Sequence, residues 1–338
     1  MAKHNWLLFS LIILTVVSFI VTVVFNALSA ITNNGVFATT ANNVSDRYSL
    51  DITPAGWTFS VWSVIYIWNG LWIVYVVSTL FRKNTKGYIY VQPGLHPPEF
   101  FVIWIVNNIV NIGWLFLWDQ EILIFANVFI VLLPISLYLM LTISYWNCYK
   151  YGAWMSENNR FDLWCTRILV HNGLATYATW ASVATLLNFG IVLKYYVKIE
   201  DPSVSNIILC LICLALVFWL MMVTFVFEKY VRYTFTIYPV AIVAAVGVYA
   251  GSETSSELST VNMINVIILN FFSFVSSSGD YLTACLLRFI LLFTCHKLRP
   301  LFSEKTVSTL NGELIESGKK TSGSQGHINP LTIEMAES

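Results

Sequence analysis

Apolar runs of about 20 residues recur along almost the whole chain, and they restrict its fold more than any other feature. A helix needs about 20 such residues to cross the roughly 30 Å of hydrocarbon in a bilayer. The runs are continuously apolar rather than alternating, which argues against the strands of a membrane β-barrel. Only 11% of the residues are charged, against about 25% in soluble domains. We therefore predict an all-α integral membrane protein that crosses the bilayer several times.

The apolar runs predict eight membrane-spanning helices. The first, from Trp6 to Leu28, is longer than the apolar core of a usual signal peptide. The last is overlong for one crossing and is interrupted by Ser276 to Asp280. It forms either one long tilted helix or a short helix outside the membrane that leads into the span. The predicted spans are 6–28, 57–81, 99–118, 122–146, 164–193, 206–228, 233–251 and 262–297.

The polar segments between the spans alternate in charge, and this alternation predicts the orientation. Basic segments such as 82–98 alternate with acidic ones such as 119–121. By the positive-inside rule both termini are cytoplasmic, so the connection 29–55 faces outward. That connection contains the sequon Asn43-Val44-Ser45, which predicts a glycan on Asn43. The membrane is then the plasma membrane or another membrane of the secretory pathway.

Three of the predicted helices carry aromatic and amide side chains at spacings of three or four residues, which place them on one helix face. A buried amide in hydrocarbon needs a hydrogen-bond partner, so such residues face other helices rather than lipid. Small residues beside them permit close helix contact or leave room for a flat ligand. The residues are Trp62, Tyr66 and Gly70 in 57–81, Asn111 and Trp114 in 99–118, and Tyr177, Trp180, Ala184 and Asn188 in 164–193.

The run from Tyr177 to Asn188 fills every fixed position of the pattern W-A-x-x-A-T-x-L-N. With the spacing from Trp62 to Gly70 and the Asn111–Trp114 pair, the chain resembles the tryptophan-rich sensory protein (TspO/MBR) family, which includes the mitochondrial translocator protein. The resemblance implies a five-helix bundle with a pocket near one membrane face and the long first loop folded over it. It also implies flat, apolar ligands such as tetrapyrroles and sterols.

The resemblance also assigns residues to that pocket, where aromatic walls would supply contact area and a few amides would orient the ligand. Those implied to line or border it are Trp62, Asn111, Trp114, Trp180, Ala184 and Asn188, with Trp57 and Phe59 at the mouth. The same helix faces add Tyr66 and Tyr177.

The resemblance covers roughly residues 1–194 and looks closest to larger family members with extra C-terminal helices. We therefore divide the chain into a TspO/MBR-like five-helix unit at 1–194 and about three additional transmembrane helices at 195–302. The segment 303–338 is rich in Ser, Gly, Lys and Glu and is predicted to be a disordered cytoplasmic tail. Because the family often dimerises, a homodimer is a further implication.

Packing alone is the alternative explanation for these patterns. Trp and Tyr concentrate at membrane interfaces, and buried amides can simply tie helices together. Arg167 and His171 lie one turn apart; we predict that the arginine reaches the cytoplasmic interface and that the histidine makes a local hydrogen bond.

The predicted function is binding of a small hydrophobic ligand, tetrapyrrole- or sterol-like, by a carrier or sensor. One alternative is a secondary transporter or permease, but the spans carry few charges and no convincing internal repeat. Another is a scaffold whose partners bind the cytoplasmic tail.

Several classes of function receive no support from the sequence. It contains no nucleophile elbow, phosphate loop or HExxH motif, so we expect no enzyme. The six cysteines show no spacing typical of a zinc site or a disulfide framework, and neither a metal nor a cofactor is expected. A formal net charge of +0 implies no nucleic-acid partner, which leaves the lipid bilayer and the ligand as the expected partners.

Overall fold

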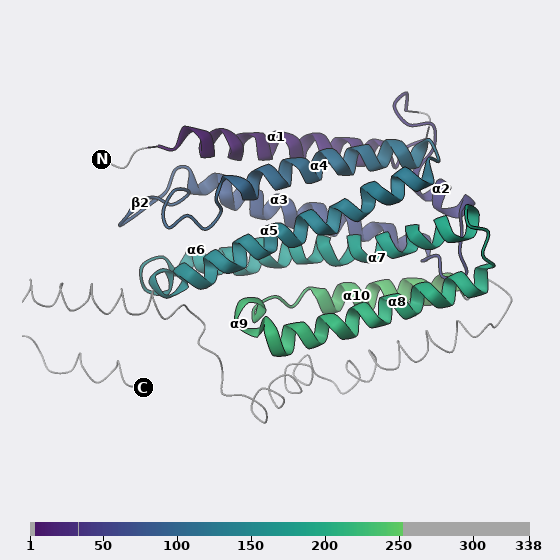
Figure 1. Ribbon diagram of the computed structural model, residues 1–338. Coiled ribbons are helices and arrows are strands. Elements are labelled where there is room, and N and C mark those ends of the chain that lie inside the picture. The colour runs from purple at the N-terminus through teal and green to yellow at the C-terminus, as the bar shows by residue number, and fades with distance from the viewer. Residues whose placement is uncertain (1–3, 33, 253–338) are drawn as a thin grey trace, which may run out of the picture.

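A computed structural model describes residues 4–32 and 34–252, in which long helices lie side by side (Figure 1). The long helices are α1 (Trp6–Leu28), α3 (Val61–Thr79), α4 (Pro98–Asp119), α5 (Leu123–Asn158), α7 (Asn172–Tyr195), α8 (Asp201–Met221) and α10 (Ile237–Ser252). The shorter helices are α2 (Ala41–Arg47), α6 (Arg160–Cys165), α9 (Glu228–Val231), the 3-10 helix η1 (Gly56–Ser60) and the π-helices η2 (Thr166–His171) and η3 (Met222–Val226). Strands β1 (Lys83–Asn84) and β2 (Gly87–Tyr88) form a small antiparallel hairpin.

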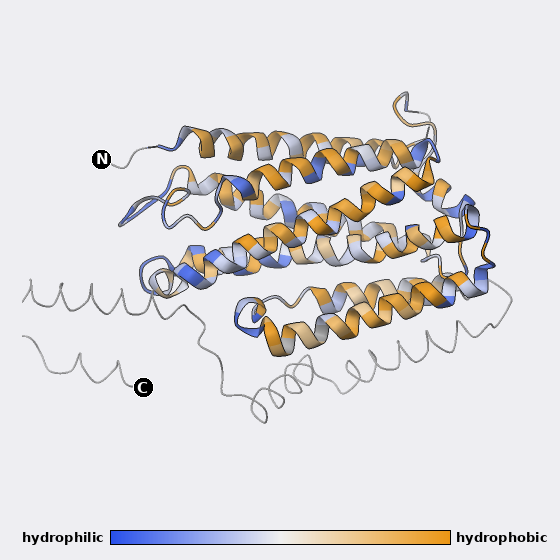
Figure 2. Ribbon diagram, in the orientation of Figure 1, coloured by the Kyte–Doolittle hydropathy of each residue, from blue (hydrophilic) through white to orange (hydrophobic). Residues whose placement is uncertain are grey.

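Within the described residues, six helical segments are long and apolar enough to cross a membrane. These segments are hydrophobic along most of their length, and hydrophilic residues are most frequent at the two ends of the bundle (Figure 2). Large apolar side chains on the surface of the bundle, such as Ile67, Val74 and Phe125, are more than half exposed. Such surfaces suit lipid rather than water. The predicted all-α, multi-pass membrane fold is confirmed.

Close packing of aromatic and small residues holds the bundle together. Helix α5 packs against α4 and α7, α1 packs against α4, and α8 and α10 both pack against α7. Trp72 and Trp104 are fully buried, with ring centroids 4.9 Å apart in an edge-to-face arrangement. Polar side chains also link α1 to α4: Asn108 Nδ2 donates to Ser18 Oγ at 3.1 Å. Interhelical hydrogen bonds of this kind satisfy groups that lipid cannot.

Several helix ends differ from the prediction. Helix α5 does not end near residue 146 but continues to Asn158, and α6 begins at Arg160, so the predicted loop 147–163 is mostly helical. At 1.5 Å per residue its 36 residues extend about 54 Å, well beyond the hydrocarbon. The extension is stabilised by a second hydrophobic cluster, made of Leu95, Cys148, Ala153, Trp154, Met155 and Leu163.

The C-terminal spans are only partly covered by the structure. The predicted span 206–228 corresponds to α8 and η3, and the helix begins earlier, at Asp201, with a proline in its first turn. The predicted span 233–251 corresponds to α10, whose 16 residues make it shorter than the spanning helices. The predicted span 262–297 and the predicted tail 303–338 lie outside the described residues.

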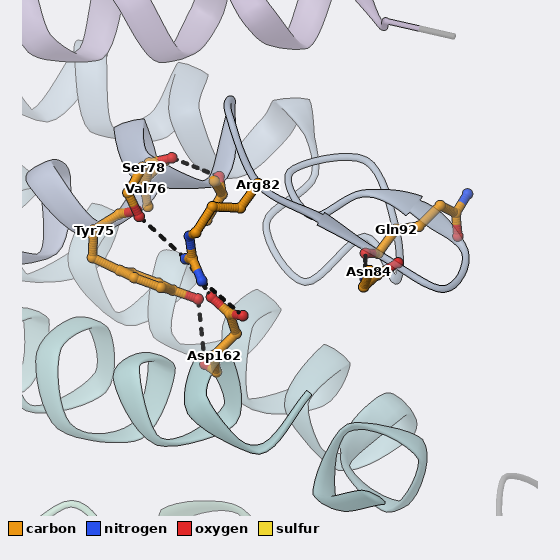
Figure 3. A network of polar contacts seen from close by, with 8 residues as sticks. Tyr75, Val76, Ser78, Arg82, Asn84, Gln92 and Asp162 are labelled. Carbon is orange, nitrogen blue, oxygen red and sulfur yellow. Dashed lines mark hydrogen bonds and ion pairs between the residues drawn. The ribbon is translucent and has the colours of Figure 1, made fainter. Parts of the chain in front are cut away.

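An ion pair joins Arg82, just after the end of α3, to the buried Asp162 of α6, at the end of the bundle that carries the hairpin (Figure 3). Arg82 reaches both carboxylate oxygens of Asp162, with Nη2 to Oδ1 at 2.6 Å and Nη1 to Oδ2 at 3.1 Å. The same guanidinium donates to Ser78 Oγ, and the Tyr75 hydroxyl donates to the Asp162 carbonyl. The Asp162 side chain is only 1% exposed, so Arg82 takes the place of water as its partner.

Candidate functional site

Two adjoining cavities lie beneath the 29–55 connection, at the α2 end of the bundle. The larger has a volume of about 530 Å³ and the smaller about 80 Å³. Phe59, Trp62 and Trp114 line both cavities, so these three rings form a wall between them. We call this set the shared wall.

The start of the second predicted helix positions the first part of the shared wall. Pro54 and Ala55 precede the 3-10 turn η1, in which the Thr58 hydroxyl donates to the Ala55 carbonyl at 2.7 Å. Helix α3 then places Trp62 and Tyr66 one turn apart, with ring centroids 6.0 Å apart and nearly parallel. The aromatic stripe therefore faces the larger cavity, which Tyr66 also lines.

The 29–55 connection covers both cavities and is hydrogen-bonded to α4. The Trp118 indole donates to the Ala41 carbonyl at 3.1 Å, and its ring stacks on Trp114. The Asp119 carboxylate accepts hydrogen bonds from the backbone N–H groups of Ala38 and Thr39. The connection contributes Thr40, Ala41 and Asn42 to the larger cavity and Ser45, Leu50, Thr53 and Pro54 to the smaller one.

Helix α7 supplies the opposite side of the smaller cavity through Trp180, Ala184 and Asn188. The four-residue spacing of these side chains places them on one face, as the sequence predicts. Ala184 leaves space beside the indole because its side chain is a single methyl group. Of the predicted site residues, those that line one or both cavities are Phe59, Trp62, Tyr66, Trp114, Trp180, Ala184 and Asn188.

The other predicted site residues lie elsewhere. Asn111 is fully buried; its Oδ1 accepts from Asn26 Nδ2 at 2.8 Å and its Nδ2 donates to the Tyr177 hydroxyl at 3.1 Å. Tyr177 meets the edge of Trp62, with ring centroids 5.8 Å apart. Tyr177 therefore contacts the shared wall and Asn111 holds Tyr177 in place, but neither residue lines a cavity. Trp57 is 48% exposed and lines neither cavity.

Sequence reasoning missed several lining residues. Asn26 lines the larger cavity from α1, and its amide, isolated in an apolar span, was a signal that could have identified it. Ile130 and Ile191 line the smaller cavity, but nothing distinguishes them from other apolar residues of their helices. Asn43, in the predicted sequon, is exposed on α2, and its glycosylation stays a prediction.

Some buried polar atoms around the cavities lack a hydrogen-bond partner within the described part of the chain. They include Nε1 of Trp114, Nε1 of Trp180 and Oδ1 of Asn188. Buried donors and acceptors are nearly always paired, and an unpaired one costs about 1–3 kcal/mol. Two donors and one acceptor are therefore available around the smaller cavity to a ligand or to water.

Helix α10, outside the predicted five-helix unit, contacts the mouth of the smaller cavity. The Ala55 N–H donates to the Gly247 carbonyl at 2.9 Å. A Cβ added at Gly247 would collide with the Thr58 side chain, and one added at Gly251 would collide with the Thr53 carbonyl oxygen. The two glycines therefore allow α10 to lie directly against residues 53–58.

A second polar cluster lies at the other end of the bundle, away from the cavities. The Ser144 hydroxyl lies 3.3 Å from His96 Nε2 and 3.0 Å from His171 Nε2, and all three side chains are buried. His171 makes the local hydrogen bond that the sequence predicts. A serine hydroxyl can donate to one imidazole and accept from the other, so this arrangement needs no charged histidine.

Stability should depend on pH through His96, which precedes α4. Burial lowers the pKa of His96 to about 4 from 6.5. Between these values the unfolded chain binds more protons, so the free energy of unfolding falls as the pH is lowered from 6.5 to 4, by at most about 3 kcal/mol. Urea titrations at several pH values should show this loss, and His96→Gln should flatten the curve. If the free energy of unfolding depended on pH equally in the wild type and in His96→Gln, His96 would not be the group responsible.

Comparison with known proteins gives one match. The model of a family described as TSPO-like protein matches residues 12–275. No curated protein and no solved structure gives a significant match. The matched range contains every residue that lines the two cavities, and it continues past residue 194 through α8 and α10.

Proposed function

The chain belongs to the TspO-like family of membrane proteins, and on that premise we propose that it binds a flat hydrophobic molecule, sterol- or tetrapyrrole-like, as a carrier or sensor. The observation that carries the proposal is the pair of cavities divided by the shared wall. A volume of about 530 Å³ falls in the range of small-molecule sites, which are concave, mostly apolar and contain a few polar groups. Aromatic rings supply the contact area that such a ligand needs.

The polar groups around the cavities favour a neutral ligand. Among the described residues, no acidic, basic or thiol side chain lines either cavity. A charged group placed there would lose hydration without gaining a counter-ion. The carboxylates of a porphyrin would therefore have to remain in water, so we expect a sterol to bind more tightly than a porphyrin.

The same lining supports binding without catalysis. Its polar groups are indoles, amides, aliphatic hydroxyls and one phenol. General acid–base catalysis near neutral pH needs a group whose pKa lies close to the working pH. Indoles, amides and hydroxyls do not titrate there. We accordingly propose a binding protein rather than an enzyme.

Substitution of the shared wall tests the proposal. With the full-length protein in detergent, Trp62→Ala is expected to weaken binding of a sterol or porphyrin at least about tenfold, because it removes apolar surface from both cavities. Trp180→Ala should have a similar effect through the smaller cavity. A labelled sterol and the absorbance shift of a porphyrin report binding without using tryptophan fluorescence, which the substitutions themselves change.

The matched control is Trp6→Ala, since Trp6 is 71% exposed at the start of α1 and should leave binding unchanged. Unaltered affinity in both Trp62→Ala and Trp180→Ala, with both proteins folded, would rule out the proposed pocket. If the protein in proteoliposomes moved a substrate against its concentration gradient, and this movement needed an ion gradient, a permease would instead be favoured.

We also propose that the cavity end faces outward and the hairpin end faces the cytoplasm. The exposed sequon on α2 and the lysines and arginines near β1, β2 and α6 support this orientation. In cells, glycosidase treatment should increase the gel mobility of the wild-type protein but not of Asn43→Gln. A wild-type protein that reaches the cell surface with no glycosidase-sensitive shift would contradict the outward position of Asn43.

A further inference from the structure

Two cations converge on a small cavity at the hairpin end of the bundle, far from the shared wall. The cavity has a volume of about 20 Å³ and lies between α5, η2 and α9. No carboxylate lines it within the described residues. Its lining residues are Tyr145, Cys148, Tyr149, Arg167, His171, Lys229, Tyr230 and Tyr233.

The sequence predicts that Arg167 extends to the cytoplasmic interface, but in the structure this residue is buried and only 7% exposed. Its guanidinium lies 4.1 Å from the centroid of the Tyr233 ring and 5.2 Å from that of Trp164. Each ring contributes about 2 kcal/mol when the contact is shielded from water, whereas burying an ion without a counter-ion costs several kcal/mol. The arrangement favours an anion beside Arg167.

The buried carboxylates at this end already form ion pairs with other arginines. Asp162 is held by Arg82, and Glu228 is held by Arg232, whose Nη2 lies 2.9 Å from Oε2. Neither Arg167 nor Lys229 forms an ion pair with a described residue. Lys229 instead places its ammonium 4.7 Å from the Tyr149 ring centroid and 4.9 Å from that of Tyr230.

We propose that this cavity, lined by Arg167 and Lys229, binds the phosphate group of an anionic phospholipid. About 20 Å³ holds one water-sized group, so one phosphate oxygen can enter while the rest of the ligand stays outside. A guanidinium and an ammonium on two neighbouring elements are the groups that bind phosphate most strongly. Basic pockets between helices at the cytoplasmic face recognise lipid headgroups in this way.

The surroundings favour a lipid as the source of the phosphate. Trp146 is 59% exposed and stacks on Tyr230, one of the lining residues. An exposed tryptophan beside the cations provides apolar surface for the first part of an acyl chain. A soluble phosphate compound would not use this surface.

Lipid retention by the full-length protein tests the proposal. Purified protein is mixed with phosphatidylglycerol or phosphatidylcholine in detergent, and bound lipid is counted by native mass spectrometry. We expect phosphatidylglycerol to be retained about tenfold better, and Arg167→Gln and Lys229→Gln each to lower its retention about fivefold or more. The control Arg160→Gln removes an exposed arginine at the same end and should change nothing.

The outcomes separate the possible sources of the phosphate. Displacement of the lipid by millimolar inorganic phosphate would support the same site with soluble phosphate as a second occupant, whereas its failure would support the lipid alone. If Arg167→Gln does not fold, the retention measured for Lys229→Gln tests the proposed site. Retention equal to wild type in a folded Lys229→Gln protein, or no preference of the wild type for phosphatidylglycerol, would overturn the proposal.

Discussion

Replacing Arg82 by methionine is expected to lower the free energy of unfolding by about 3 kcal/mol, because the Asp162 carboxylate would remain buried without a counter-ion. The side chain of Arg82 is itself 33% exposed, which places the effect at the lower end of the range for buried pairs. Asp162→Asn should cost less, since Arg82 can turn toward water. Unfolding in mixed micelles with increasing SDS measures both losses.

The chain supplies a matched control for this prediction. Arg47 forms an ion pair with Glu121 at 2.7 Å, but the two side chains are 52% and 31% exposed. Arg47→Met should therefore cost less than about 1 kcal/mol. Equal losses for Arg82→Met and Arg47→Met would mean that burial of Asp162 does not determine the strength of the pair.

Gly251→Ala is expected to destabilise the protein by about 1–3 kcal/mol, the usual cost of overpacking. A loss of stability would be informative, because replacing glycine by alanine inside a helix normally stabilises the helix by about 1 kcal/mol. Here the new Cβ would meet the Thr53 carbonyl oxygen, a backbone atom that cannot rotate away. Helix α10 would have to move off residues 53–58, and the bond from the Ala55 N–H to the Gly247 carbonyl would be lost.

Gly70→Ala is the control, because a Cβ there would meet Phe19 at an ordinary 3.6 Å. Thermal unfolding should rank Gly251→Ala below wild type and Gly70→Ala at or above it. Thr53, Pro54 and Thr58 line the smaller cavity, so Gly251→Ala should also release bound ligand faster. A Gly251→Ala protein as stable as wild type would show that α10 is not held against the mouth.

The sequence predicted the spans because hydrocarbon thickness and helix rise fix their length. It could not predict where α5 ends, since past residue 146 a helix is favoured by the hydrophobic cluster around Trp154 and Met155. Nor could it predict η2, because a π-helix depends on the packing of the neighbouring helices rather than on local preference.

The spacing of residues along the sequence predicted the site correctly where one whole helix face lines a cavity, as it does for Trp180, Ala184 and Asn188. Spacing could not distinguish the residues that line the cavities from those that only contact the lining residues. Asn111 shares a helix with Trp114, yet hydrogen bonds to Asn26 and Tyr177 keep its amide out of the cavities. Those partners come from other helices, and their positions emerge only from the tertiary structure.

Phe59, Trp62 and Trp114 line both cavities, and this shared lining links the two spaces thermodynamically. Because closely packed rings cannot be compressed, a ring that turns to widen one cavity narrows the other. Two occupants would then show heterotropic cooperativity: whatever factor the first imposes on the affinity of the second, the second imposes on the first. Competition between them would arise without any contact between the two molecules.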